Sequence, residues 1–330
     1  MKDKWQPLPW QESIWQSLIK QQLADRLPHA LLLRGVQGVG KFHFARAFAA
    51  QLLCQAPEAE HACGHCKECS LVKAGTHPDL LIIQPESAGK PIKIDQVRKI
   101  NNFARKTAQQ GGRRVVVISP AEAMNINAGN ALLKSLEEPG GDTVFLLVSD
   151  RVGDMLPTIR SRCQLITFPT PLRAVAVDWL SEHIADRVVI DQLLNLSGNS
   201  PVAAWDMFDQ GTLEVRGKLI NAMAGLFRGE ITPVELAKDW QSANLPQLLG
   251  WLGSWLDDVV RISLTADDKG IRNHDLVKML NYLAGKSPAK SVVRLRDKTY
   301  EQRQQLQDGA NLNAQIMLEG MFSKYLELVV

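Results

Sequence analysis

The segment Gly35–Phe42 has the spacing of a phosphate-binding loop, but its last position carries the wrong chemistry. Three glycines and a lysine supply the phosphate-binding groups: Gly35, Gly38, Gly40 and Lys41. The glycines let backbone N–H groups close around phosphate oxygens, and the lysine adds a positive charge. The position after the lysine needs a Ser or Thr hydroxyl to hold Mg²⁺, and here it is Phe42. We expect a nucleotide-shaped loop without phosphoryl transfer, and whether Lys41 still binds nucleotide stays open.

The residues on either side of the loop predict the elements that a phosphate-binding loop requires. Ala30–Leu33 is an apolar run typical of a buried strand, and His43–Ala50 predicts a helix. A strand, a glycine loop and a helix in this order favour a phosphate-binding loop over a plain glycine-rich turn.

A second metal-handling position is also missing. Val115–Ile118 is a β-branched run typical of a central parallel strand. In ATPases with this loop, such a strand ends in acidic residues that hold Mg²⁺ and act in catalysis. Here those positions are Ser119 and Pro120. Glu122 lies two residues further on, and we interpret it as an exposed or capping residue. The sequence therefore predicts no ATP hydrolysis.

Four of the five cysteines form the pattern C-x8-C-x2-C-x2-C within sixteen residues: Cys54, Cys63, Cys66 and Cys69. Tetrahedral zinc prefers four thiolates, and the C-x2-C spacing brings two sulfurs together from one turn. Gly64 favours that turn. With all four ligands from protein, no position is open for a catalytic water, so we predict a structural zinc. Four reduced, metal-free thiols are the alternative. Cys163 stands apart and predicts a buried thiol.

Three further segments resemble the clamp-loader branch of the AAA+ ATPases. They are the ten residues Asn130–Pro139, the strand Val144–Leu147 and the triplet Ser161–Cys163. The first, Asn-Ala-Leu-Leu-Lys-Ser-Leu-Glu-Glu-Pro, is long enough to be specific. The resemblance extends strongly over residues 29–168 and weakly to 208. Members of this family carry a similar zinc insert after the loop helix. The chain departs from the motor subunits of the family at Phe42, Ser119 and Pro120.

The resemblance implies a role for Arg162. In the family, the arginine of this triplet is an arginine finger, offered to the γ-phosphate of ATP in a neighbouring subunit. A guanidinium suits this task because it is always charged and its planar fork matches phosphate oxygens. The alternative is that Arg162 only pairs with a local carboxylate. Arg160 is the expected surface arginine.

The chain is predicted to combine α/β and all-α parts. Residues 1–168 form an AAA+ domain of parallel strands, with the cysteine module at 54–69. Residues 169–210 form a helical lid and residues 211–330 a helical collar that oligomerises. The lid residues Pro201–Ala203 lack the nucleotide-sensing arginine of the family. The predicted strands are Ala30–Leu33, Leu80–Ile83, Val115–Ile118, Val144–Ser149 and Gln164–Phe168. Asp95–Phe103 predicts an amphipathic helix with Asp95 as its N-cap.

Composition sets limits on the function. The chain has 330 residues, 45% hydrophobic and 22% charged, with a net charge of +3. This charge is too small for DNA affinity based on bulk electrostatics. No apolar run approaches the ~18 residues of a membrane span, and Met1–Trp5 lacks the pattern of a signal peptide. We expect a cytoplasmic protein that contacts no membrane.

The resemblance implies a non-hydrolysing stator in the clamp loader of the DNA polymerase III holoenzyme, which helps load the sliding clamp at primer–template DNA. Its implied partners are the motor subunits (gamma/tau), the delta subunit, the sliding clamp and the DNA. An active ATPase of the same superfamily, with metal held by Glu122, is the alternative. A zinc-ribbon reader of nucleic acid is a weaker third, since only Lys67 and Lys73 lie near the cysteines.

Overall fold

The chain forms two compact units in a computed structural model. The first holds residues 1–183 and 199–203, and the second holds residues 184–198 and 204–330. The predicted lid, residues 169–210, contributes to both units, and the boundaries at 168 and 210 stay predictions. The described residues are 5–87, 89–104, 106–110, 112–265, 267, 269–307 and 309–329. Most of the N-terminal stretch inspected for a signal peptide, Met1–Lys4, lies outside them.

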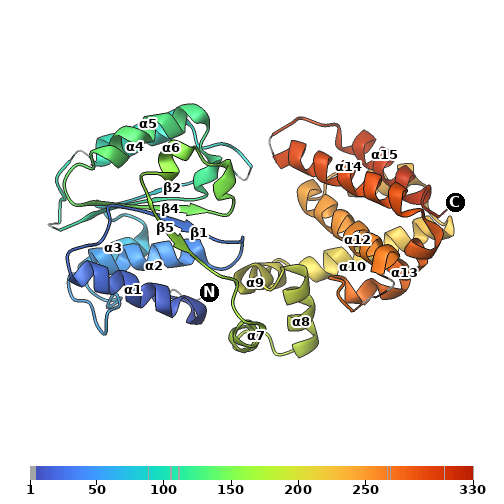
Figure 1. Cartoon of the computed structure of the whole chain (residues 1–330), viewed down its shortest axis with the longest axis horizontal. Coiled ribbons are helices and arrows are strands. Elements are labelled where there is room, and N and C mark those ends of the chain that lie inside the picture. Colours follow the sequence, from blue (N-terminus) through green and yellow to red (C-terminus); the bar gives the residue numbers. More distant parts are fainter. Residues whose placement is uncertain are drawn as a thin grey trace. The chain divides into compact units, whose positions relative to one another are not determined.

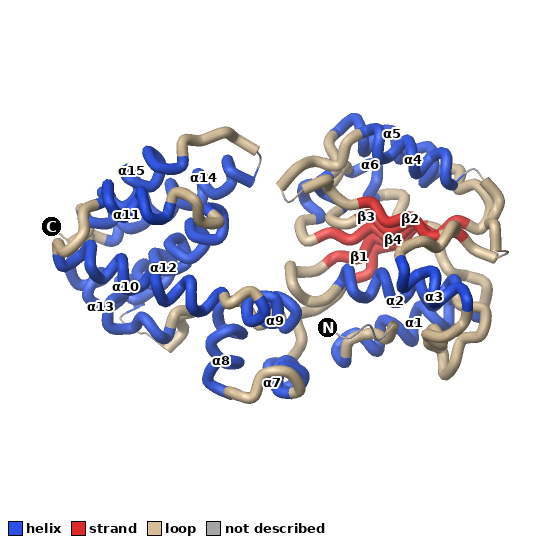
Figure 2. Tube along the Cα trace, turned by 180° about the vertical axis from the view of Figure 1, so that it is seen from behind, coloured by secondary structure: helices blue, strands red, loops and turns tan. Residues whose placement is uncertain are grey.

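A five-stranded parallel sheet forms the centre of the first unit, with the order β2-β3-β4-β1-β5 (Figures 1 and 2). All five predicted strands are present, each within one residue of its predicted ends. Consecutive parallel strands need crossovers, and helices supply most of them here. The strands are β1 (Ala30–Arg34), β2 (Leu80–Ile83), β3 (Arg114–Ile118), β4 (Thr143–Ser149) and β5 (Gln164–Thr167).

Helices cover both faces of this sheet (Figure 1). Successive residues of a strand point to opposite faces. Leu31 and Leu33 therefore join an apolar cluster with Phe44 and Phe48 of α2, while Leu32 packs on the opposite side with α4 and α5. The helices on the α2 face are α1 (Glu12–Leu23), α2 (Lys41–Leu53) and α3 (Lys67–Ala74). Those on the other face are α4 (Ile94–Ala104), α5 (Ile126–Glu137) and α6 (Pro157–Arg160).

The start of α4 differs from the sequence prediction. The helix begins at Ile94, so Asp95 lies inside its first turn rather than at the cap. There the Asp95 carboxylate accepts a hydrogen bond from Arg98 at 2.8 Å. Gln96 accepts the Lys93 N–H at 3.0 Å instead. An acidic residue in the first turn still favours the helix through its dipole.

Helices follow β5 to the end of the described chain. The segment after Phe168 carries Pro169 and Pro171 and has no regular element until α7, as predicted from these prolines. The next helices are α7 (Arg173–Ser181), α8 (Arg187–Leu196) and α9 (Pro201–Asp209). Within the second unit they are followed by α10 (Thr212–Arg228), α11 (Pro233–Trp240), α12 (Leu245–Thr265), α13 (Val277–Lys286), α14 (Ala289–Gln307) and α15 (Ala314–Leu326). The predicted combination of α/β and all-α parts is confirmed.

The core of the second unit is formed mainly by α12 with the helices packed on it. Trp255 and Leu252 of α12 are almost fully buried, as are Met321 and Tyr325 of α15. The apolar stripe of α15 is therefore mainly internal core, whereas Ile316 on the same helix is 68% exposed. Among the described residues, no helix is both long and apolar enough to span a bilayer.

Candidate functional site

The loop Gly35–Gly40 joins β1 to α2, as the strand–loop–helix pattern predicts. Gly38 and Gly40 have φ angles of +81° and +83°, a region that side chains disfavour. Gly35 faces another constraint, because a Cβ at this position would lie 2.5 Å from the Phe168 carbonyl oxygen. All three glycines therefore have local reasons to be glycine.

Lys41 is buried, and its ammonium is engaged by groups of its own chain. Its Nζ lies 2.6 Å from an oxygen of Asp150, the residue directly after β4. The same Nζ donates to the carbonyl oxygens of Gly35 and Val36, both at 2.7 Å. An ammonium has three N–H donors, so these contacts match its full capacity. Asp150 also places a negative charge where a phosphate group would need to meet the lysine.

Two other segments of the first unit pack against the loop. The Gly38 carbonyl accepts the N–H groups of Val202 and Ala203, at 3.0 and 3.3 Å. A Cβ on Gly38 would lie 2.3 Å from the Ala203 Cβ, so this contact is close. On the N-terminal side, the Val39 carbonyl accepts from the side chains of Trp10 and Gln11, both at 2.9 Å.

The residues that replace the metal-binding positions have structural contacts. Phe42 packs against the apolar cluster on the α2 face of the sheet. Ser119 and Pro120 directly follow β3, and Ser119 N–H donates to the Ile83 carbonyl at 3.0 Å. Glu122 accepts the N–H groups of residues 150 and 151 with one oxygen, at 2.9 and 3.1 Å. The carboxylate of Glu122 thus caps the loop after β4, in agreement with its interpretation as a capping residue.

Arg162 lies just beyond α6 and forms an ion pair with Glu137, the last residue of α5. The Arg162 Nη2 is 2.5 Å from Glu137 Oε1, with the two side chains 35% and 48% exposed. This is the local pairing that the alternative interpretation named. About two turns earlier in α5, the helix packs closely on the start of α6, since a Cβ on Gly129 would lie 2.6 Å from the Leu156 side chain. Arg162 is thus paired but still reachable from solvent, whereas Arg160 is exposed.

The four cysteines of the predicted metal module converge. Their sulfurs all lie within 4.8 Å of one another. Three separations are 3.7 Å (Cys54–Cys63), 3.9 Å (Cys54–Cys66) and 3.9 Å (Cys63–Cys69). Four ligands at about 2.3 Å from a tetrahedral zinc are separated by about 3.8 Å. The four sulfurs therefore fit a metal ion such as zinc.

Backbone N–H groups point at these sulfurs. Cys54 Sγ accepts from the Cys63 N–H, Cys63 Sγ from the Cys66 N–H, and Cys66 Sγ from the Cys69 N–H, at 3.3–3.4 Å. Burial acts to raise the pKa of the Cys66 thiol, but hydrogen bonds from the Cys69 and Gln55 backbone and from neighbouring thiols outweigh it and lower the pKa to about 6. Burial raises the pKa of Cys54 and Cys69. A thiolate is the form that binds metal. Burial alone raises the pKa of Cys163 to about 11, in keeping with an inert thiol.

A buried pair anchors the cysteine module to the sheet. Glu68 on α3 lies 2.9 Å from His77 Nε2, and both side chains are at most 2% exposed. His77 Nδ1 accepts the Asp79 N–H at 3.0 Å, so a neutral imidazole carries its proton on Nε2, the nitrogen beside the Glu68 carboxylate. Burial lowers the pKa of His77, against the opposing effect of Glu68 and Asp79. The two groups are thus a buried polar contact at 2.9 Å, without the geometry of a hydrogen bond.

Replacing His77 by Ala is expected to destabilise the first unit by about 2 kcal/mol, because the buried Glu68 carboxylate loses its nearest polar partner. Urea unfolding of the intact chain measures the change. His65→Ala is the matched control, since its imidazole side chain is 69% exposed in the same module. Equal stability of both variants would contradict the anchoring role of the Glu68–His77 pair.

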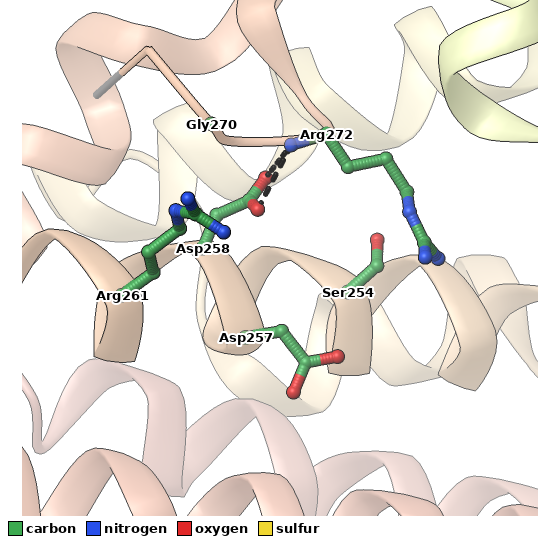
Figure 3. Close-up of a pocket in the computed structure, with 6 residues that line it drawn as sticks. All are labelled: Ser254, Asp257, Asp258, Arg261, Gly270 and Arg272. Atoms are coloured by element: carbon green, nitrogen blue, oxygen red, sulfur yellow. Dashed lines mark hydrogen bonds between the residues drawn. The ribbon is translucent and has the colours of Figure 1, made fainter. Parts of the chain in front are cut away.

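A polar cavity of about 250 Å³ lies in the second unit, between α12 and the segment that follows it (Figure 3). The Asp258 carboxylate there accepts the N–H groups of Arg272 and Asn273, at 2.8–3.1 Å. Asp257 points away from Asp258 and binds the Tyr300 hydroxyl at 2.5 Å. Asp258 thus fixes the chain after α12, while Asp257 links α12 to Tyr300 of α14.

Sequence reasoning missed two carboxylates near the predicted sites. Asp150 is the partner of Lys41, and Glu137 is the partner of Arg162. The position of Asp150 directly after a predicted strand is a usable signal, since carboxyl ends of parallel strands share one edge of a sheet. Glu137 lay inside the motif Asn130–Pro139, but its pairing with Arg162 depends on the packing of α5 and α6.

Comparisons with known proteins give a consistent family. A sequence model described as DNA polymerase III, delta subunit, matches residues 10–171, and one described as its C-terminal region matches residues 210–324. DNA polymerase III subunit delta' of Pseudomonas aeruginosa is 44% identical over 324 residues, which are 97% of each chain. The subunit of the same name from Escherichia coli is 32% identical and covers 94% of this chain and 92% of its own.

Among solved structures, a DNA polymerase III gamma subunit-related protein of Thermotoga maritima has a TM-score of 0.47 and 17% identity. The match covers 97% of this chain and 100% of that one. The two sequence models and the sequence relatives carry the family assignment.

Proposed function

The chain belongs to the family of DNA polymerase III subunit delta', and we propose that it is the non-hydrolysing stator of a clamp loader. In this role it does not hydrolyse ATP. It presents Arg162 to the γ-phosphate of ATP held by a neighbouring subunit. It thereby takes part in loading a sliding clamp onto primed DNA.

The contacts of Lys41 are the observation that carries this proposal. Its ammonium already binds Asp150 and two loop carbonyls. A nucleotide would have to break a buried ion pair and approach the Asp150 charge, without a Ser or Thr at position 42 to hold its metal. Removing the partner of a buried charge is costly. The loop therefore supports a structural role better than a catalytic one.

The exposure of Arg162 supports the second half of the proposal. A trans finger has to be both fixed on its own subunit and accessible to the next one. With its side chain 35% exposed and bound at Glu137, Arg162 meets both conditions. It is therefore the residue that we assign to the neighbour's γ-phosphate.

We further propose that the metal is zinc, one ion per chain, held by the four cysteines of the module. Bound zinc supplies folding energy and has no coordination position open for water. The four cysteines would hold the loop 54–69 around the ion. The contact between Glu68 and His77 joins that loop to the segment before β2. The role of the module is structural.

The partners that we propose are the motor subunits (gamma/tau), the delta subunit, the sliding clamp and primer–template DNA, in the cytoplasm. Residues 211–330 would supply the oligomerising collar of this assembly, and residues 169–210 its lid. Family membership supports this set, since the relatives carry the name of a DNA polymerase III subunit.

The isolated chain is expected to show no ATPase and no nucleotide binding, measured by phosphate release and by fluorescence of a labelled ATP analogue. Lys41→Ala should instead lower the stability by about 2 kcal/mol, because the carboxylate of Asp150 loses a buried charged partner. Urea unfolding of the same samples measures this loss.

Turnover by the isolated chain that disappears in Lys41→Ala would overturn the stator proposal and favour the active ATPase. Lys73→Ala is the control for loss of a lysine charge, since Lys73 is exposed on α3. It should change neither binding nor stability.

A further inference from the structure

Glu137 and Thr158 together hold the guanidinium of Arg162. Glu137 Oε1 accepts from Arg162 Nε at 2.8 Å and lies 2.5 Å from Nη2. On the other side, Nη1 donates to the Thr158 carbonyl at 2.9 Å. All three nitrogens of the guanidinium therefore have a partner within the first unit.

These contacts differ in strength, and the distal end of the guanidinium is the less firmly held part. Nε and one N–H of Nη2 form the side edge of the fork, which Glu137 occupies. Nη1 and Nη2 each carry two hydrogens. Nη1 also donates to the Ser161 hydroxyl oxygen at 3.4 Å, the longest contact of this guanidinium, whereas Nη2 keeps one hydrogen that Glu137 does not occupy. Exchange of the long Ser161 contact for a phosphate oxygen would provide two parallel N–H groups, which suit a pair of phosphate oxygens. A phosphate can thus bind Arg162 while Glu137 keeps its own edge.

We propose that Glu137 is a positioning residue for the arginine finger, and the proposal rests on the finger role of Arg162 described above. Glu137 fixes the guanidinium plane through its side edge and directs the distal N–H groups outward. Arginine has many rotamers, so a side chain fixed in advance loses less freedom when phosphate arrives.

The place of Glu137 in the fold agrees with this role. Glu137 is the last residue of α5 and directly precedes Glu138 and Pro139, where the helix ends. The neighbouring Leu136 is buried, which fixes this end of the helix to the core. Thr158 belongs to α6, which packs on α5. The two groups that hold Arg162 are thus both on rigid elements, as accurate positioning requires.

Solvent exposure argues against a mainly stabilising role for the pair. With side chains 35% and 48% exposed, Arg162 and Glu137 form an ion pair of the kind that contributes little to stability. Orientation of the finger is the larger consequence of the contact. A merely structural pair would alter unfolding and leave the kinetics of a neighbouring subunit unchanged.

The test uses the reconstituted clamp loader with DNA and clamp, and pre-steady-state phosphate release, which separates its ATP sites as kinetic phases. Arg162→Ala should remove one phase. Glu137→Gln should slow that same phase by about tenfold, within the ~10²-fold that a 1 Å misplacement can cost. The ATP concentration for half-maximal rate should stay unchanged, since the loss occurs in the chemical step.

Two further variants show whether Glu137 acts through Arg162. Glu138→Gln removes the same charge from the adjacent exposed residue and should leave every phase unchanged. In the Arg162→Ala background, Glu137→Gln should have no additional effect on any phase, because the group that it positions is absent. Thermal unfolding of each variant confirms that all of them fold.

The possible results separate this proposal from the finger role itself. If Arg162→Ala leaves all phases intact, the finger role fails. If Arg162→Ala removes a phase that Glu137→Gln leaves unchanged, only the positioning role fails. A faster phase in Glu137→Gln would also overturn it, because Glu137 would then restrain the finger instead of orienting it.

Discussion

Arg162→Ala is expected to lower the rate of ATP hydrolysis at one neighbouring site of the assembled loader by about 10³-fold or more, the range for loss of an arginine finger. The reason is that negative charge on the transferring phosphoryl group loses a fixed cation. Phosphate release by the complex with DNA and clamp measures the loss. Arg162→Lys should restore little, since a flexible point charge does not reproduce the planar fork.

The same variant should remain folded and assembled. Its ion pair with Glu137 is partly exposed, and such pairs contribute about 0–1 kcal/mol to stability. Arg160→Ala is the matched control, an exposed arginine two residues away that should alter neither quantity. A stability loss in isolated Arg162→Ala, with unchanged ATPase in the full complex, would assign Arg162 to local structure alone.

The sheet could be predicted from sequence because its strands are buried on both faces. A strand buried on both faces gives a continuously apolar run, as in Val115–Ile118. Glycine or proline residues near the ends of such runs mark where the strands stop. The ends of helices were harder to predict from the sequence. Asp95 is a good N-cap by residue type, yet the helix begins at Ile94 and Asp95 pairs with Arg98. Side-chain capping competes with several neighbours within one turn, and the sequence does not rank them.

The phosphate-binding loop shows a different limit. Its spacing, its missing hydroxyl and its missing acids could be read directly from the sequence. The partner of Lys41 could not be predicted, because its contact with Asp150 exists only when β4 lies beside β1 in the sheet. The same holds for Val202 and Ala203, which reach Gly38 from a distant part of the chain. The motif residues show which metal-binding groups are missing, whereas tertiary packing determines which side chains contact Lys41 instead.

The convergence of the four cysteines could be predicted from the sequence, since four thiols at short spacing have few uses other than metal binding when they form no disulfides. The attachment of the module to the sheet could not be predicted, because Glu68 and His77 come into contact only in the folded chain. The attachment matters for the energetics. Through this contact, loss of the proposed metal would disturb the first unit and not only a surface loop.

Removal of the metal is expected to have the largest effect on stability. Structural zinc contributes roughly 10–16 kcal/mol to the folding of small zinc peptides. In this chain the hydrophobic core also stabilises the fold, so the metal contributes a smaller part. We therefore expect Cys66→Ser to lower the free energy of unfolding by about 5 kcal/mol and to release zinc. Elemental analysis should give one zinc per native chain and less in the variant, and urea unfolding measures the loss of stability.

Hydrogen exchange shows where the change occurs. Amides of residues 54–74 should lose protection first, followed by the start of β2, because Glu68 no longer holds His77. Cys163→Ser is the control, since it removes a thiol outside the cluster and should leave the zinc content unchanged. Native protein that contains no zinc, or Cys66→Ser with unchanged zinc and stability, would rule out a structural metal. The four sulfurs would then be reduced thiols held together by the packing of α2 and α3 alone.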